Sequence, residues 1–206
     1  MTNKYNKPAR VNGLILAGGR ARRMSGQDKG LVLLQGISLI EHCISTLSPQ
    51  VNQLFISANR NIAQYQKFAF PVLEDSTDDH EGPLAGLQRA LEASPDMPVL
   101  VIPCDAPLFP IQLVARLLKV YQENHCFAVI PHDGTRLQPL FGLFSPSSLA
   151  SLNQYFSTGQ RKVETWVTSL SHQVVDFSDQ SEHFLNINTI DDLHHAESIL
   201  ELARRC

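Results

Sequence analysis

A run of cations follows a pair of glycines directly after the apolar segment 11–16. The glycines are Gly18 and Gly19, and the cations are Arg20, Arg22, Arg23 and Lys29. Because glycine has no Cβ, the backbone there can turn sharply and approach a ligand closely. Several cations beside exposed backbone amides favour a polyanion such as a nucleoside triphosphate. The alternative is an ordinary turn after a strand, with its basic side chains in solvent.

This stretch differs from the two best-known phosphate loops. A Walker loop has Ser or Thr after its Lys, where the hydroxyl reaches magnesium, but Gly30 follows Lys29 here. The dinucleotide fingerprint G-x-G-x-x-G is also absent from this stretch. The sequence therefore indicates a third kind of triphosphate loop. In it, Lys29 would neutralise charge that builds on a leaving pyrophosphate, and Arg23 would share that task through forked hydrogen bonds.

Asp105 is the strongest candidate for a metal ligand. It comes directly after the apolar run 99–104, which predicts a carboxylate at the mouth of a buried strand. A hard carboxylate beside a triphosphate site is a natural ligand for Mg²⁺. The alternative is an Asp that starts a turn before Pro107.

The elements that must position these residues alternate along the chain. Apolar strand-like runs at 11–16, 53–58, 70–73, 98–103 and 126–130 are separated by helical patterns at 38–47, 63–68, 84–93 and 111–121. This alternation predicts an α/β fold, a mostly parallel sheet covered by helices on both faces. The carboxyl ends of parallel strands lie at one edge of such a sheet, where ligands bind. The residues that follow these strands should therefore converge.

The alternation weakens after Pro131. We expect a strand over 140–144 that pairs antiparallel, helices over 147–155 and 161–168, a strand over 174–177 and a closing helix over 190–203, with Thr189 as its N-cap. We predict a flexible N-terminus over 1–10 and a single domain over 11–206, since no repeat or long linker divides the chain.

The composition limits the classes of partner. The chain has 206 residues, 43% hydrophobic and 18% charged, with a net charge of -3. A basic loop in a mildly acidic protein favours a small anion over a nucleic acid. The polar first ten residues lack the apolar core of a secretory signal, and no apolar run is long enough to span a membrane. We therefore expect a cytoplasmic protein, with no membrane or nucleic-acid partner and with reduced cysteines.

The motifs together resemble a known family. Leu16-Ala17-Gly18-Gly19, Arg23-Met24 and Asp28-Lys29-Gly30 are similar to the signature of nucleotidyltransferases that couple a nucleoside triphosphate to a phosphorylated acceptor. Within that superfamily the chain most resembles the molybdenum cofactor guanylyltransferases. That narrower resemblance rests on Gly18-Gly19, Asn59-Arg60, 82–86 and 186–189.

The resemblance implies a Rossmann-like three-layer α/β/α sandwich and a reaction. GMP would pass from GTP to the terminal phosphate of molybdenum-molybdopterin, with Mg²⁺ as cofactor. Molybdenum cofactor insertion proteins and molybdoenzyme chaperones would be further partners. The alternatives are a cytidylyltransferase or sugar-phosphate nucleotidyltransferase, and a non-catalytic nucleotide- or cofactor-binding module. The presence of both Lys29 and Asp105 speaks against the last.

The resemblance and the residue types together imply the following site residues. Catalysis would involve Lys29, Asp105 and Arg23, with Asp105 as the metal ligand. Nucleotide binding would involve Leu16, Ala17, Gly18, Gly19, Lys29, Ser57, Asn59, Asp75 and Asp105. Acceptor binding would involve Gly82, Pro83, Asn186 and Asn188. Ser57 stands where this family often has Asn, and its shorter side chain reaches less far. Gly82-Pro83 could instead simply begin a helix, and the Asn186–Asn188 segment could serve a turn or a helix cap.

Overall fold

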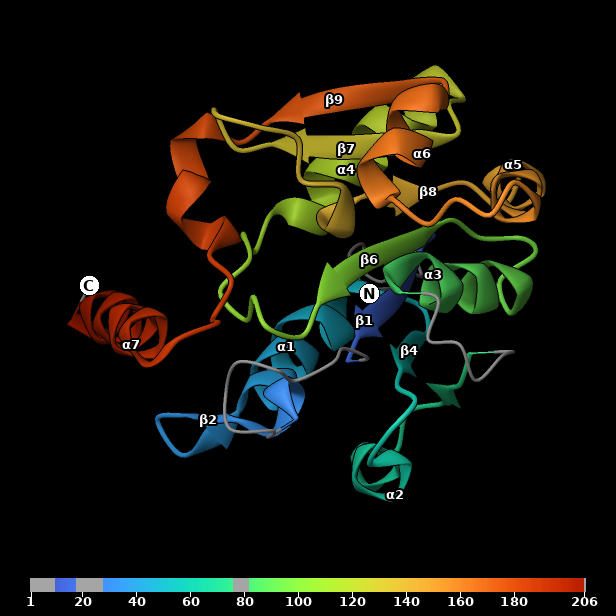
Figure 1. The fold of residues 1–206 in the computed structure, drawn as a ribbon. Helices are drawn as coiled ribbons and strands as arrows, with labels where there is room; N and C mark the ends of the chain where they lie inside the picture. The colour runs from blue at the N-terminus through green and yellow to red at the C-terminus, as the bar shows by residue number, and fades with distance from the viewer. Residues whose placement is uncertain (1–9, 18–27, 76–81, 206) are drawn as a thin grey trace, which may run out of the picture.

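The computed structural model describes residues 10–17, 28–75 and 82–205. Within these residues seven strands form one sheet in the order β5-β4-β1-β6-β8-β7-β9, and only β8 runs antiparallel to its neighbours. Figure 1 shows the sheet running from β9 to β4 through the middle of the molecule. The strands are β1 (Asn12–Leu16), β4 (Leu54–Ser57), β5 (Val72–Leu73), β6 (Val99–Pro103), β7 (Ala128–His132), β8 (Leu143–Phe144) and β9 (His172–Asp176). The predicted α/β class with a mostly parallel sheet is confirmed.

The carboxyl ends of β1, β4 and β6 lie side by side. Leu16, the last residue of β1, is in register with Ser57 of β4 and with Pro103 of β6. The order of strands in the sheet changes direction at β1, because β4 and β5 lie on one side of β1 and the later strand β6 lies on its other side. Ligands of open α/β sheets bind outside the carboxyl ends of the strands at such a switch point. The predicted convergence of strand ends at one edge is therefore confirmed.

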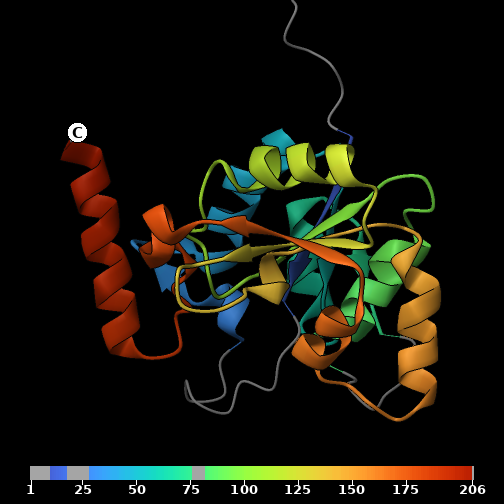
Figure 2. The ribbon, with the colours of Figure 1, turned by 90° about the horizontal axis from the view of Figure 1, so that it is seen from above.

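Helices cover both faces of the sheet. One apolar cluster packs α1 and α4 on one face, and a second packs α3, α5 and α6 on the other. Figure 2 shows the resulting three layers. The predicted α/β/α sandwich is thus confirmed. The helices are α1 (Leu39–Leu47), α2 (Ile62–Tyr65), α3 (Pro83–Glu92), α4 (Leu113–Asn124), α5 (Ser148–Ser157), α6 (Val163–Ser169) and α7 (Ile190–Arg205).

The last helix, α7, lies at one end of the molecule rather than on either face of the sheet (Figure 2). It packs on a small hairpin formed by β2 (Leu33–Leu34) and β3 (Ile37–Ser38). A third apolar cluster joins the two, with Leu34 of the hairpin and Ala196 of the helix both fully buried. This packing fixes the segment that leads into α7.

Short 3-10 helices connect several of these elements. They are η1 (Lys29–Leu31), η2 (Ser48–Gln50), η3 (Gln66–Phe68), η4 (Pro139–Phe141) and η5 (Ser178–Phe184). Two of them alter the predicted bounds. The helix predicted for 63–68 is divided between α2 and η3, and the strand predicted for 140–144 shortens to β8 because Pro139 begins η4. β7 starts later than predicted, because α4 runs to Asn124 and His125 ends it in a left-handed conformation, with φ 48°.

The N-terminal residues 1–9 lie outside the described residues, so the expected flexibility of 1–10 stays a prediction. So does the assignment of 11–206 to one domain. In the part of the chain that the structure describes, no helix has both the length and the apolar character needed to cross a membrane.

Candidate functional site

Asp105 lies at the switch point, two residues beyond β6. The end of β6 is tied to β1 because the Cys104 N–H donates to the carbonyl oxygen of Leu16 at 3.0 Å. The Asp105 side chain is 17% exposed and accepts from the Lys29 ammonium, with 2.9 Å between Nζ and Oδ2. A carboxylate at this depth reaches solvent but has a fixed position. The structure thus places two predicted catalytic residues in direct contact.

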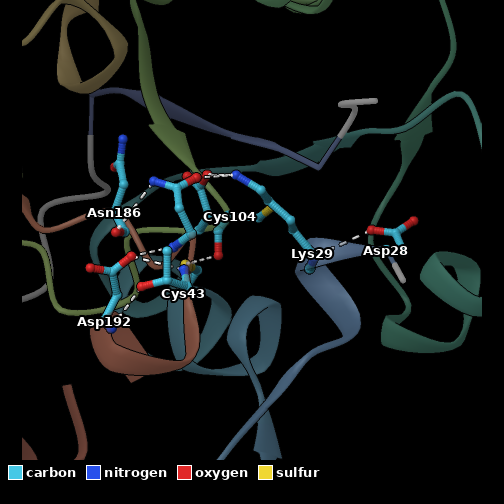
Figure 3. A network of polar contacts seen from close by, with 10 residues as sticks. Asp28, Lys29, Cys43, Cys104, Asn186 and Asp192 are labelled. Carbon is cyan, nitrogen blue, oxygen red and sulfur yellow. Dashed lines mark hydrogen bonds and ion pairs between the residues drawn. The ribbon is translucent and has the colours of Figure 1, made fainter. Parts of the chain in front are cut away.

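Lys29 also donates to the amide oxygen of Asn188. Its ammonium therefore lies between a carboxylate oxygen and an amide oxygen from two other parts of the chain. Figure 3 shows Lys29 extending away from Asp28 toward this polar group. We call Lys29, Asp105 and Asn188 the Lys29 cluster. The cluster joins η1, the end of β6 and the segment before α7, so only the fold brings its members together.

One backbone bond holds the segment before α7 against the end of β6, and three more bonds hold the segment to the first turn of α7. The N–H of Ile187, which is buried, donates to the backbone oxygen of Asp105 at 2.7 Å. The carboxylate of Asp192 then accepts from the N–H groups of Asn188 and Thr189, both at 2.9 Å, and the Asp192 N–H donates to the Thr189 hydroxyl. These reciprocal bonds form a capping box, which confirms Thr189 as the predicted N-cap. Hydrogen bonding from the Asn188 N–H holds the pKa of Asp192 below its usual value.

Asn186 lies beside the Lys29 cluster (Figure 3). Its side-chain oxygen is buried and has no hydrogen-bond partner among the residues that the structure describes. An unpaired buried acceptor costs free energy unless a ligand or water satisfies it. Asn188 therefore supplies an amide oxygen to the same ammonium that Asp105 contacts, and Asn186 supplies a buried oxygen beside the cluster.

A second polar contact lies at the ends of β4 and β5. The Asn59 amide donates to Asp75 Oδ2 at 2.6 Å, and the Asp75 N–H donates to Asn59 Oδ1 at 2.8 Å. The two bonds fix which end of the Asn59 amide faces the carboxylate. We call these two residues the Asn59–Asp75 pair. It brings together two of the predicted nucleotide-binding residues.

Leu16, Ala17 and Ser57, which were also predicted to bind the nucleotide, form backbone hydrogen bonds that join neighbouring strands. The Ala17 N–H donates to the Ser57 carbonyl at 2.8 Å, and the Leu16 carbonyl already accepts from Cys104. Ser57 is buried, and its hydroxyl would clash with a Cβ on Gly86. Ser57 thus packs against the first turn of α3, and this packing leaves no room for a side chain at position 86.

Of the predicted acceptor-site residues, Gly82 and Pro83 begin α3. Gly82 has φ 80°, a left-handed conformation that glycine tolerates well, and Pro83 occupies the first turn of the helix. The structure supports their helix-starting role. Binding of an acceptor by either residue stays a prediction.

Several predicted site residues lie outside the described residues. They are Gly18, Gly19 and Arg23, together with the neighbouring cations Arg20 and Arg22. Their assignment to the triphosphate stays a prediction.

The thiols near the site are not activated. Cys43 and Cys104 are buried beneath Asp105, and burial raises the pKa of both, with the Asp105 charge adding to the rise. A protonated, buried thiol is a poor nucleophile. Cys43 and Cys104 therefore belong to the core and not to the reacting groups of the site.

Sequence reasoning named Asp28 only as part of the Asp-Lys-Gly element and missed Asn61 and Tyr65, which bond to it. The Asp28 carboxylate accepts from the Tyr65 hydroxyl and, at 3.0 Å, from the Asn61 amide. Asn61 is the N-cap of the short helix α2 and Tyr65 is its last residue, and in the sequence they resemble ordinary turn and core residues. Their place in the sequence was the one available signal for a role near the site, because α2 directly follows β4 at the carboxyl edge of the sheet.

The donor set fits a magnesium ion. Two hard oxygens, from Asp105 and Asn188, already converge on one cation, the Lys29 ammonium. Mg²⁺ typically takes one or two protein carboxylates and completes its shell with water and substrate phosphates. Among residues 10–17, 28–75 and 82–205, no three or more His, Cys, Asp or Glu side chains gather into a candidate metal site.

Comparisons with known proteins agree with this geometry. Residues 13–174 match the family described as MobA-like NTP transferase domain. The chain is 43% identical over 181 residues to a molybdenum cofactor guanylyltransferase of Shewanella halifaxensis (strain HAW-EB4). The matched residues make up 88% of this chain and 90% of the relative.

Solved structures share the fold. Molybdopterin-guanine dinucleotide biosynthesis protein A from Archaeoglobus fulgidus superposes with a TM-score of 0.77 at 26% identity, covering 92% of this chain and 98% of that one. A 4-diphosphocytidyl-2C-methyl-D-erythritolsynthase from Anaerococcus prevotii gives a TM-score of 0.70 at 15% identity, covering 93% and 96%. The second likeness is one of fold alone.

Proposed function

The chain belongs to the MobA-like NTP transferase family, and on that premise we propose that it transfers GMP from GTP to the terminal phosphate of molybdenum-molybdopterin. It is a nucleotidyltransferase, and its relatives at about 43% identity carry the guanylyltransferase name over most of the chain. The observation that carries the proposal is the Lys29 cluster, which places a cation and a carboxylate together at the switch point of the sheet.

The reaction exchanges one phosphoanhydride bond for another. An oxygen of the acceptor phosphate forms a bond to the α-phosphorus of GTP. The bond from that phosphorus to the oxygen of the β-phosphate breaks, and pyrophosphate leaves with the electron pair. The acceptor phosphate is already ionised near neutral pH, so no protein group has to remove a proton. Catalysis is then positioning together with neutralisation of charge on the leaving group.

Lys29 supplies the neutralising charge. Its side chain is 28% exposed, so the ammonium can reach a phosphate in the site while the backbone stays anchored in η1. A preorganised cation stabilises the charge that develops on the pyrophosphate more than it stabilises the ground state. Asn188 restricts where the ammonium can lie.

Asp105 would hold Mg²⁺, with an amide oxygen of Asn186 or Asn188 as a second ligand. When bound, the ion would supply charge neutralisation and would orient the phosphate oxygens. The Asn59–Asp75 pair would lie at the nucleobase or ribose, where a carboxylate can accept from the donor edge of guanine. Substrate use by paralogous enzymes differs at such contacts rather than in the fold.

Product formation tests the proposal. The full chain would be incubated with Mg²⁺, molybdenum-molybdopterin and GTP, CTP or ATP, and both pyrophosphate and the dinucleotide would be measured. Acceptor-dependent pyrophosphate release from GTP supports guanylyl transfer. A preference for CTP would indicate a cytidylyltransferase, and nucleotide binding without pyrophosphate release would indicate a non-catalytic binding module. Transfer of the product to molybdenum cofactor insertion proteins and molybdoenzyme chaperones, and a cytoplasmic location, stay predictions.

A further inference from the structure

Asp28 ties the backbone of η1 to α2. Its carboxylate caps η1, because Oδ1 accepts from the Gly30 N–H at 3.2 Å. The same carboxylate accepts from the Tyr65 hydroxyl and from the Asn61 amide, which lie 37 and 33 residues further along the chain. One side chain therefore binds both the turn that carries Lys29 and the helix beside it.

The Tyr65 hydroxyl is held in a tight space. The residue is fully buried, its ring packs in the apolar core, and a Cβ on Gly30 would stand 2.6 Å from the hydroxyl oxygen. Any side chain at position 30 would displace that hydroxyl. The three residues of the Asp-Lys-Gly element thus have distinct tasks: Asp28 anchors the turn, Lys29 extends into the site, and Gly30 leaves room for the anchor.

Packing alone does not account for the hydroxyl. A phenylalanine ring would fill the core equally well, whereas a buried hydroxyl must find a partner to offset its lost hydration. Burial raises the pKa of Tyr65, and its hydrogen bond to Asp28 adds to the rise, so the phenol stays a donor across the neutral range. Among the described residues the three donors to Asp28 are uncharged, and the Lys29 ammonium bonds to Asp105 and Asn188 instead.

We propose that Tyr65 and Asp28 are positioning residues that fix the Lys29 ammonium in the site. The chain of contacts runs from the Tyr65 hydroxyl to the Asp28 carboxylate, through the backbone of η1 to Lys29. Only Lys29, at the end of this chain of contacts, would touch a substrate. This positioning role rests on the proposed function only where turnover is the readout.

Removal of the hydroxyl alone tests the proposal. Tyr65→Phe keeps the ring and its packing, so we expect kcat to fall about tenfold while the KM for GTP changes less than about threefold, because a displaced catalytic group slows the chemical step. Tyr121→Phe is the matched control, since Tyr121 also donates its hydroxyl to one side chain, Ser145, at 3.2 Å. The control should keep the wild-type kcat. An equal loss of kcat in both variants would overturn the proposal.

A double-mutant cycle separates positioning from general stability. If Tyr65 acts through Lys29, Tyr65→Phe has no further effect on kcat in a Lys29→Ala background. The same fold-loss in both backgrounds would contradict it. The double variant Asp28→Asn with Asn61→Asp offers a rescue. It restores the hydrogen bond between residues 28 and 61 with the donor and acceptor exchanged. We expect Asp28→Asn alone to lose kcat and the exchanged pair to recover most of it.

A measurement without substrates distinguishes this proposal from the proposed function. The ¹⁵N resonance of the Lys29 ammonium, assigned by its loss in Lys29→Ala, reports whether the ammonium is held between its two partners. We expect Tyr65→Phe to shift it toward the resonances of exposed lysines, and Tyr121→Phe to leave it unchanged. An unchanged resonance in Tyr65→Phe overturns the positioning role even if guanylyl transfer is found. A shift without any guanylyl transfer by the wild type refutes the proposed function alone.

Discussion

The Lys29 cluster and the Asn59–Asp75 pair lie at the same edge of the sheet but are built differently. Lys29 is 159 residues from Asn188 and 76 from Asp105, whereas Asn59 and Asp75 are only 16 apart. The cluster contains opposite charges and depends on two flanking anchors, Asp28 and Asp192. The pair holds itself in place through two reciprocal hydrogen bonds. We predict that the cluster sets the rate and that the pair sets which nucleotide is used.

Loss of Asp105 should give the largest effect. We expect Asp105→Ala to lower Mg²⁺-dependent transfer by more than about a thousandfold, because it removes both the proposed metal ligand and the ionic partner of Lys29. The fold should survive, since Ile187 bonds to the backbone oxygen of Asp105 and not to its side chain. Steady-state turnover and circular dichroism measure the two effects.

Asp179→Ala is the control for this variant. Asp179 also forms an ion pair, with Arg116 at 3.4 Å, but its side chain is 60% exposed and it lies on η5 rather than in the cluster. It should turn over normally. Near-normal transfer by Asp105→Ala would remove Asp105 from the mechanism.

Lys29→Ala should come second. A lost charge-stabilising contact costs about 3 kcal/mol, or some hundredfold in rate. Arg20→Ala should cost much less, because Arg20 lies outside the Asp-Lys-Gly element. Single-turnover rates with saturating GTP would compare the two variants. Equal losses would mean that a diffuse basic patch, rather than one positioned ammonium, serves the triphosphate.

The Asn59–Asp75 pair should affect selectivity more than rate. We expect the wild type to use GTP well ahead of CTP and ATP, because guanine presents two donors that match a carboxylate. Asp75→Asn should lower the GTP-to-CTP ratio about tenfold, since an unpaired polar group costs on the order of 1–3 kcal/mol. Competition at equal nucleotide concentrations measures the ratio. Glu74→Gln, which changes the exposed neighbouring acid, is the control, and a comparable change in that variant would contradict a specific role for Asp75.

Asp192 should have the smallest effect. Asp192→Asn weakens the bonds that orient Asn188, so we expect turnover to fall less than about tenfold and the melting temperature to drop slightly. The pKa of Asp192 is lowered in the folded state. Its stabilisation is therefore present above the unfolded-state pKa, near 4, and is lost as the pH falls through the folded-state value.

The difference in melting temperature between wild type and Asp192→Asn should accordingly be present at pH 7 and fade below about pH 4. Asp191→Asn, in the same first turn of α7, is the control and should show no such pattern. A difference that persists unchanged at low pH would show that the lost carboxylate is not its cause.

The strands and the edge at which they end could be predicted because apolar runs and the residues after them are local features. Asp105 was recognisable for that reason. The Lys29–Asn188 contact was not, because it depends on α7 packing against the β2–β3 hairpin and so on tertiary structure. Tyr65 was overlooked because its ring carries the same apolar signal as any core residue. The Leu16 carbonyl, expected near the nucleotide, also bonds to Cys104, which no pattern in the sequence indicates.

The late position of Asn188 in the chain affects when, during synthesis, the enzyme can first catalyse transfer. The chain is made from its N-terminus, so Lys29 leaves the ribosome 159 residues before its amide partner. At about 5–20 residues per second this interval is roughly 8–30 s. During it the first strands can pair and Lys29 can meet Asp105, but the segment that restrains the ammonium does not yet exist. A nascent chain can therefore bring Lys29 to Asp105 well before it can restrain the ammonium for transfer.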